Sequence, residues 1–428
     1  MLRTLLLSLV SLSSGSLARA QTDPVLASRA EYGDAVRAYR AHDFAAFLQH
    51  AKRAEELRPE HGGVVYALAS AYALTGDDDR ALATLRRFAA LGYFADVAAD
   101  SDLVRLRGSA EYDGVRRALE ANRRPVVSSG VAFTLPERDL LTEGIAYDPR
   151  GKAFFVGSVH HRKIVRVDRS GRTADFVSTG RDSLWAPLGM KVDTARRVLW
   201  VAAAAVPQML EYDSADAGRS GLFRYELSSG TLTGRVIIPS DGAAHLLGDL
   251  TIARNGDVYA SDSRAPVVWR LRAGADSLER LVESPLILSA QGLALSEDER
   301  TLFLADYSRG TLKIDLVSLR VTLLPGREGV LALGIDGLYR DGGTLIGIQN
   351  GMEPHRVVRL TLDAPGDSLV GSEVLERLHP AHAEPTLGVL VGRDLYYVAN
   401  SQWERFGETG AVARPDELAF PTVLRLRL

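Results

Sequence analysis

The chain has 428 residues, of which 46% are hydrophobic and 25% charged, a globular balance that excludes a disordered or collagen-like chain. Its 51 basic and 54 acidic residues leave a formal charge of −3, which argues against nucleic-acid binding as the main role. The absence of cysteine excludes a thiol nucleophile, a cysteine-ligated zinc, an iron–sulfur cluster and a disulfide framework.

The first twenty residues have the features of an export signal. Arg3 supplies a positive start, residues 5–12 form a short apolar run, and Ala18-Arg19-Ala20 is a small-x-small cleavage site. A membrane anchor would need about 20 apolar residues, and residues 13–16 interrupt this run with serines. We therefore expect residues 1–20 to be a signal peptide. The mature protein is expected to be periplasmic or secreted and to have no membrane span.

The composition and periodicity of residues 21–124 predict a helical domain. The segment is rich in Ala, Leu, Arg and Glu, and its apolar residues recur at helical spacing. The pattern predicts two helix pairs, over about 26–57 and 62–91. Their breaks lie 34 residues apart, from Asp43 to Asp77, which is the period of a tetratricopeptide repeat. A further capping pair is expected over 102–119.

The second of these pairs resembles the tetratricopeptide family at Leu68, Ala69, Tyr72, Gly76 and Ala81. The first pair matches it at Ala54 and Pro59. This resemblance implies a module that docks a protein or peptide partner. The alternative is a helical packing domain that covers one face of the C-terminal domain.

From residue 129 to residue 428 one sequence pattern recurs six times: a glycine, an alternating apolar strand, a polar turn and a second strand. The copies begin at Glu143, Leu188, Gly248, Gln291, Asp336 and Leu387. Their spacings of 45, 60, 43, 45 and 51 residues predict an all-β six-bladed propeller. Strands over 422–428 and 131–135 would share the last blade and close the ring, which removes exposed sheet edges. The fold class is therefore multidomain, an all-α domain followed by a propeller.

The residues that begin the six copies should ring one mouth of the central channel. Glu143 and Asp336 bring carboxylates and Gln291 an amide, with Asp249 directly behind the ring. Such oxygen donors suit a divalent cation, with Ca²⁺, Mg²⁺, Mn²⁺ and Zn²⁺ as candidates. The alternative is that these groups cap loops and bind channel water.

Three of the copies carry a family resemblance: Glu143-Gly144, Gln291-Gly292-Leu293-Ala294 and Asp336-Gly337-Leu338. They resemble the senescence-marker-protein, gluconolactonase and luciferin-regenerating-enzyme family of six-bladed propellers, over about residues 140–400. The resemblance implies a divalent metal held by a Glu, two Asn and an Asp. In that family the metal polarises a lactone carbonyl and the Asp serves as general base. Glu143 matches the Glu and Asp336 the Asp.

The sequence departs from this family at two of the four ligands. Gln291 replaces one Asn by a longer amide, and Gly248 stands in place of the other. The family's Arg shortly before that Asn is also missing, because residues 245–247 read His-Leu-Leu. Asp249 or His245 could compensate.

Four further residues are candidates for substrate binding near the mouth: His245, His160, Glu384 and Trp403. Glu384 shares a Pro-flanked loop with His382, where an imidazole could act as a proton shuttle. Trp403 would offer an aromatic platform of the kind that binding pockets use. The alternative for these residues is a solvated or packing role.

Two functions from different classes are compatible with these features. The first is an exported metal-dependent hydrolase of a lactone or related ester, with the cation on Glu143, Gln291 and Asp336 and with Asp336 as the base. The second is a non-catalytic propeller that binds a small molecule in its channel and a protein partner on its helices.

Overall fold

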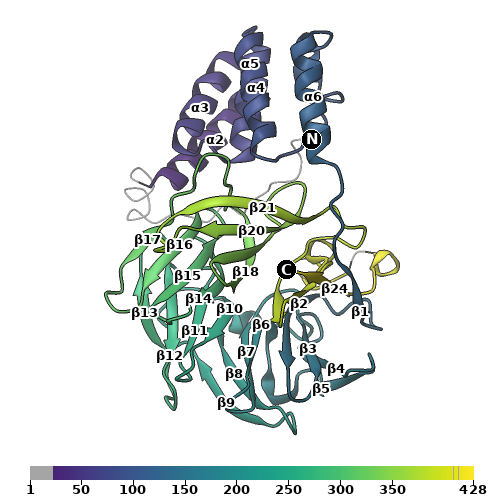
Figure 1. The fold of residues 1–428 in the computed structure, drawn as a ribbon, viewed down its shortest axis with the longest axis vertical. Helices are drawn as coiled ribbons and strands as arrows, with labels where there is room; N and C mark the ends of the chain where they lie inside the picture. The colour runs from purple at the N-terminus through teal and green to yellow at the C-terminus, as the bar shows by residue number, and fades with distance from the viewer. Residues whose placement is uncertain (1–22, 408, 413) are drawn as a thin grey trace. The chain divides into compact units, whose positions relative to one another are not determined.

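The computed structural model describes residues 23–407, 409–412 and 414–428, which divide into two compact units (Figure 1). The first unit holds the helices up to Arg124 together with Met352–Pro354, and the second holds the other residues from Pro125 onward. The predicted signal segment, residues 1–20, lies outside the described residues. Among the helices that are described, none has both the length and the apolar character needed to cross a membrane.

The first unit is all-helical. Its elements are α2 (Pro24–Arg40), α3 (Phe44–Leu57), α4 (Gly62–Leu74), α5 (Asp78–Ala90), the 3₁₀ helix η1 (Ser101–Leu106) and α6 (Ala110–Asn122). A polar side chain begins each α-helix by accepting a free backbone N–H, as Asp43 does from Ala46 at 3.0 Å and Ser109 from Tyr112 at 3.1 Å. Fully buried small residues, Ala35, Ala51 and Ala71, let the helices approach closely.

The two predicted helix pairs are present, as α2 with α3 and α4 with α5. The expected capping pair differs, because its first member is the six-residue η1 rather than an α-helix. Gly108, at a φ of 87°, turns the chain there, and Ser109 caps α6. The tetratricopeptide-like character of the pairs stays a prediction.

The second unit consists of six four-stranded antiparallel sheets, which confirms the six-bladed β-propeller. Blade 1 holds β2 (Thr142–Asp148), β3 (Ala153–Ser158), β4 (Lys163–Val167) and β5 (Thr173–Val177). Blade 2 holds β6 (Ala186–Asp193), β7 (Val198–Ala204), β8 (Ser220–Glu226) and β9 (Leu232–Ile237). Blade 3 holds β10 (Leu247–Ile252), β11 (Val258–Asp262), β12 (Val267–Leu271) and β13 (Glu279–Glu283).

Blades 4 and 5 repeat this meander. Blade 4 holds β14 (Ala290–Leu295), β15 (Thr301–Asp306), β16 (Gly310–Asp315) and β17 (Val321–Leu323). Blade 5 holds β18 (Ile335–Asp341), β19 (Thr344–Gln349), β20 (Arg356–Leu362) and β21 (Leu369–Arg377). Short 3₁₀ helices lie in the loops at Arg181–Ser183, Ser214–Asp216, Trp403–Arg405 and Pro415–Glu417.

Blade 6 closes the ring with strands from distant parts of the chain. It holds β22 (Gly388–Val391), β23 (Asp394–Val398), β24 (Thr422–Arg427) and β1 (Gly130–Thr134). Figure 1 shows β24, in yellow, beside β1. The register runs from Gly130 opposite Arg425 to Thr134 opposite Thr422. The predicted closure is therefore present.

The first strand of each blade lies beside the first strands of its two neighbours, and β22 returns to β2. Apolar side chains fill the space between blades. Trp200 and Leu222 of blade 2, for example, share one core with Leu250 and Val258 of blade 3. Because the inner strands form a closed circle, residues at equivalent positions on them face a common centre.

Candidate channel site

Five of the six inner strands carry a β-bulge at the positions that the sequence predicted to ring the channel. In β2, for example, Thr142 pairs with Ser158 and Ile145 with Val156, so Glu143 and Gly144 together oppose Gly157. The other bulges fall at residues 188–189, 248–249, 291–292 and 336–337. A bulge leaves its extra residue out of the ladder and re-aims the side chain. It is therefore the bulge that frees Glu143, Gln291 and Asp336 from the sheet.

The glycine that follows the ring residue is required by crowding between neighbouring inner strands. A Cβ on Gly144 would lie 1.9 Å from the carbonyl oxygen of Leu188, and one on Gly292 would lie 2.3 Å from the nitrogen of Leu338. Blade 3 carries Asp249 at this position. Its carboxylate occupies space that Gly189 leaves, since a Cβ there would lie 2.6 Å from Asp249 Oδ1.

Glu143 and Asp336 form an electrostatically coupled pair of carboxyl groups inside the channel. Burial, reinforced by the charges of Asp249 and Glu384, raises the pKa of Asp336 to about 7. Burial also raises the pKa of Glu143 well above its usual range, and the charge of Asp336 adds to the effect. The contacts that favour the ionised forms are hydrogen bonds from neutral groups, Trp403 for Glu143 and Asn350 for Asp336. In the described part of the chain, neither carboxyl group forms an ion pair with a basic side chain.

Trp403 joins two predicted site residues. Its indole Nε1 donates to Glu143 Oε2 at 2.6 Å, and its backbone N–H donates to Glu384 Oε2 at 3.0 Å. Burial raises the pKa of Glu384 to about 6. The structure therefore brings Glu143, Glu384 and Trp403 into one cluster with Asp336.

Two residues of this cluster, Asn350 and Tyr307, were not predicted. Asn350 Nδ2 donates to Asp336 Oδ2 at 2.8 Å and to the carbonyl of Pro385 at 2.9 Å. The hydroxyl of Tyr307 donates to Asn350 Oδ1 at 3.0 Å. Nearby negative charges, those of Asp336 and Glu384 first, add to burial in raising the pKa of Tyr307. Asn350 thereby fixes the rotamer of Asp336.

The register of the second strand of each blade is the signal that could have identified Asn350 and Tyr307 from the sequence. Asp262, Asp306 and Gln349 pair with the residues that directly precede Gly248, Gln291 and Asp336. The residues that follow them are Ser263, Tyr307 and Asn350. These three positions are equivalent in blades 3, 4 and 5, so they lie at the same end of the channel as the ring.

Ser263 lies where the side chain missing from Gly248 would project. A Cβ on Gly248 would be 2.7 Å from Ser263 Oγ and 3.7 Å from Gln291 Oε1. The blade 3 position of the ring therefore has a hydroxyl oxygen close to it, supplied by the residue after β11 rather than by β10. Ser263 Oγ also donates to the carbonyl of Ala290 at 2.8 Å, which fixes its place.

Asp249 pairs with a lysine instead of joining the ring. Lys191 Nζ lies 3.7 Å from Asp249 Oδ1 and 5.2 Å from the ring centroid of Tyr339. Tyr339 belongs to blade 5 and Lys191 to blade 2, so the lysine side chain reaches across the channel. Burial raises the pKa of Asp249, and Lys191 opposes that effect. Lys191 and Tyr339 were also absent from the prediction.

The histidines predicted near the mouth have other partners. His245 is 4% exposed and uses both ring nitrogens, Nδ1 toward Asp262 Oδ2 at 2.7 Å and Nε2 toward Asp241 Oδ1 at 3.1 Å. His160 donates from Nδ1 to the carbonyl of Gln208 at 2.7 Å. Burial lowers the pKa of His382 to about 3, so its imidazole is neutral at physiological pH and poorly suited to shuttle protons.

The donor set of the channel fits a hard divalent cation. It consists of oxygens, and the repulsion between Glu143 and Asp336 would be relieved by positive charge between them. Among the described residues, the groups of three or more His, Asp or Glu ligand atoms that lie within 4.8 Å of one another do not include either residue. The further ligands would therefore be neutral oxygens, for which Gln291 and Ser263 are placed.

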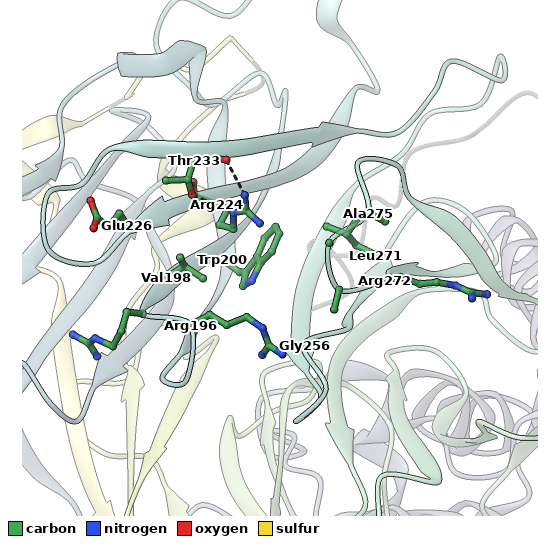
Figure 2. Close-up of a pocket in the computed structure, with 13 residues that line it drawn as sticks. Arg196, Val198, Trp200, Arg224, Glu226, Thr233, Gly256, Leu271, Arg272 and Ala275 are labelled. Atoms are coloured by element: carbon green, nitrogen blue, oxygen red, sulfur yellow. Dashed lines mark hydrogen bonds between the residues drawn. The ribbon is translucent and has the colours of Figure 1, made fainter.

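A surface cavity of about 390 Å³ lies elsewhere, between blades 2 and 3 (Figure 2). It is lined by Trp200 and by arginines that already have partners. Arg224 bonds Thr233 and stacks over Trp200 at 5.4 Å, and Arg196 bonds Asp193. The cavity shares no lining residue with the channel cluster, so it plays no part in the candidate site.

The chain matches no protein-family model and no curated protein. Similar solved structures include a gluconolactonase from Xanthomonas campestris, 15% identical, with a TM-score of 0.46 over 71% of this chain and 96% of that one. A luciferin-regenerating enzyme is 14% identical, with a TM-score of 0.44 over 71% of this chain and 95% of that one. A virginiamycin B lyase from Staphylococcus aureus is 13% identical, with a TM-score of 0.47 over 69% and 83%. The likeness is one of fold.

Proposed function

We propose that the channel mouth hydrolyses a lactone or related ester with the help of a divalent metal ion. The observation that carries the proposal is the pair Glu143 and Asp336, two buried carboxyl groups from different blades of the ring that form no ion pair with a basic side chain among the described residues. Buried acids with raised pKa values are costly to a fold and cluster at functional sites. The predicted ligands Glu143, Gln291 and Asp336 would hold the ion, with Ser263 as a fourth oxygen. When bound, the ion would polarise the substrate carbonyl and acidify a water molecule.

Asp336 is the residue proposed to take the proton of the attacking water. Asn350 holds Oδ2 of this carboxylate at 2.8 Å, which leaves Oδ1 as the oxygen that would accept the proton. The pKa of about 7 is that of the metal-free site, and a bound cation would favour the ionised carboxylate, which is the form that accepts a proton. Asn350 and Tyr307 would act as positioning residues, since they fix the carboxylate and touch no reacting atom.

Glu384 and Trp403 would form the substrate side of the site. Glu384 has a pKa of about 6, so it could return a proton to the leaving alkoxide. The indole of Trp403 is held by Glu143 and offers an apolar wall to a small ring. The carboxylates of the cluster would repel an anionic substrate, so a neutral lactone or ester is the proposed substrate class.

The test is a hydrolysis assay of lactones and aryl esters after removal of metal and after separate addition of Ca²⁺, Mg²⁺, Mn²⁺ and Zn²⁺. We expect cation-dependent turnover in the parent and a loss of about 10²–10⁴-fold in D336N. The control is E373Q, which removes an acid from the exposed pair of Glu373 with Arg359 and should leave turnover unchanged.

Hydrolysis that needs no cation and persists in D336N would overturn the proposal. A small ligand that binds the channel with the cation but is not turned over would favour the non-catalytic alternative. The proposal places this activity outside the cytoplasm, because residues 1–20 carry the features of an export signal. Secretion of the full chain, with cleavage after Ala20, would be the direct test of that part.

A further inference from the structure

A second group of metal-ligand side chains lies in the loops of blade 1, apart from the oxygen donors of the channel. One ligand atom each from Asp139, His160 and His161 lies within 4.8 Å of the others. His161 Nε2 is 3.0 Å from Asp139 Oδ2, yet this buried nitrogen makes no hydrogen bond of acceptable geometry in the described part of the chain. We infer that Asp139, His160 and His161 bind a first-row divalent transition metal of the Zn²⁺ type.

The backbone holds the three side chains in place. Ser158 Oγ donates to the carbonyl of Leu140 and accepts the backbone N–H of His161 at 3.1 Å. The carbonyl of Leu141 accepts the N–H of Val159 at 2.9 Å. The loop that carries Asp139 is thereby fastened to the end of β3, where the two histidines follow.

The tautomer of His160 is set by its neighbour. Its Nδ1 lies 2.7 Å from the carbonyl oxygen of Gln208, which can only accept, so Nδ1 carries the proton. Nε2 is then the nitrogen with a free lone pair. Metal-binding histidines usually donate their other N–H to a carbonyl or carboxylate in this way, which fixes the ring and makes it more basic. The backbone carbonyl of His160 also accepts from Leu210 at 2.8 Å, so both its main chain and its ring are tied to the same loop.

The spacing and donor types fit zinc better than calcium. Ligand atoms about 2.0–2.1 Å from a tetrahedral ion lie roughly 3.3 Å from each other, close to the 3.0 Å between His161 Nε2 and Asp139 Oδ2. Two imidazoles and one carboxylate prefer Zn²⁺, Co²⁺ or Ni²⁺, whereas oxygen-only sites prefer Ca²⁺, Mg²⁺ or Mn²⁺. Three protein ligands leave a fourth position for water or another small molecule.

The arginines next to the group in sequence, Arg138 and Arg162, have other partners. Arg138 donates to the carbonyl of Leu418 at 3.0 Å and lies over the ring of Phe420, and Arg162 donates to the carbonyl of Leu184 at 3.0 Å. The other acidic–histidine group that is spaced for a metal, Glu31, Asp34 and His50, differs in this respect. There Asp34 pairs with Arg37, and Arg53 lies 3.9 Å from Glu31. Cations of the protein thus compete with a metal at the helical group, whereas no lysine or arginine among the described residues forms an ion pair with Asp139.

The site is linked to the channel cluster through one short segment. The ring of Phe406 lies 5.1 Å from that of His160, and Trp403 in the same turn donates to Glu143. A metal that fixes His160 would therefore hold the turn over residues 403–406 as well.

The test is a titration of the purified, metal-stripped full chain with Zn²⁺ and with Co²⁺, whose visible absorption reports a tetrahedral site with nitrogen ligands. We expect one tightly bound ion with the absorption of a tetrahedral Co²⁺ site, and at least about 100-fold weaker binding of that ion in both H161Q and D139N. These two residues are partly exposed, so their variants should fold, whereas changes at the buried His160 could disturb the blade itself. H50Q serves as the matched control for the helical group, and E143Q as the control for the channel.

Unchanged Zn²⁺ affinity in H161Q and D139N would overturn the inference, as would the absence of Zn²⁺ and Co²⁺ binding in the parent. Loss of the ion in H50Q or E143Q, with retention in H161Q, would assign it to another site and overturn the inference equally. Hydrolysis by the channel is a separate readout, so failure of the ester assay would leave this result standing.

Discussion

The indole Nε1 of Trp403 donates a hydrogen bond to Glu143 Oε2 at 2.6 Å across 260 residues of sequence, so blade 6 and blade 1 meet at the centre of the candidate site. This bond favours the ionised form of Glu143, which burial and Asp336 disfavour. A hydrogen bond to a charged group contributes about 1.5–3 kcal/mol. The contact therefore matters both to the fold and to the charge of the pair.

W403F should weaken the protein by about 0.5–3 kcal/mol, because the ring remains while the donor to the buried Glu143 is lost. Chemical unfolding of W403F, E143Q and the double variant would give the coupling energy between the two side chains. W200F is a matched control, since Trp200 lies between blades 2 and 3. Independent effects of W403F and E143Q would contradict the expected coupling.

D336N should make the metal-free protein more stable above pH 7. Because the pKa of Asp336 is raised from about 4 in an unfolded chain to about 7, the folded state binds the extra proton between these values. The parent's unfolding free energy therefore falls, relative to D336N, as pH rises from 4 to 7. A difference of about 2–4 kcal/mol at pH 8, and almost none at pH 4, is expected from unfolding curves in EDTA.

The pH dependence of the unfolding free energy must be compared between the parent and D336N, because other groups also titrate in the parent. The pKa values of His61 and His382 are lowered to about 3, mainly by burial, and this makes stability rise with pH between about 3 and 6.5. That trend is shared by parent and variant and cancels in their difference. A divalent cation should stabilise the parent more than D336N at pH 8. Equal stabilisation of both would speak against an ion on Asp336.

N350L should raise the pKa of Asp336 further, because it removes the amide donor 2.8 Å from Oδ2. The amide donor stabilises the ionised form of Asp336 by about 1.5–3 kcal/mol. Its removal therefore corresponds to a rise of about 1–2 in the pKa of Asp336. The pH dependence of stability, taken as parent against N350L, should therefore extend to higher pH. Y307F removes a donor to Asn350 and should produce a smaller shift in the same direction. If Asn350 had only a packing role, N350L would lower the unfolding free energy equally at every pH.

G144A should abolish or strongly destabilise the folded propeller, because the new methyl group would lie 1.9 Å from the carbonyl oxygen of Leu188. Nothing but movement of an inner strand can relieve a clash with backbone. G343A is the matched control, since a Cβ there meets no atom within 4 Å and the backbone is not in the left-handed region. Thermal unfolding should therefore separate the two variants by many degrees, and similar midpoints would contradict the crowding argument.

The propeller could be predicted from sequence because its signal is repeated. Six copies of one sequence pattern at similar spacing identify the blades, even where the assignment of a single strand is ambiguous. The ring positions could be predicted for the same reason, since a residue before a recurring glycine marks a bulge in β2, β14 and β18. Glu143 and Asp336 occupy equivalent bulge positions, and the charge of Asp336 acts on Glu143.

The rest of the site depends on contacts that sequence spacing does not encode. Lys191 reaches Tyr339 across the channel, and Trp403 reaches Glu143 through ring closure. His245 precedes the ring position of blade 3, but Asp262 and Asp241 hold both of its nitrogens. Nearness in sequence to a ring residue is therefore weak evidence, whereas equivalent register on the second strands would have identified Asn350.

The pairing of β1 with β24 makes completion of the candidate site depend on closure of the ring. Blades 1 to 5 are continuous hairpins that can form as each stretch of chain becomes available, but Gly130 must wait for Arg425 before blade 6 is complete. Glu143 acquires its partner Trp403 from that same last blade. An open ring would thus lack the hydrogen bond from Trp403 to Glu143, so the acid cluster is complete only after the two ends of the propeller have paired.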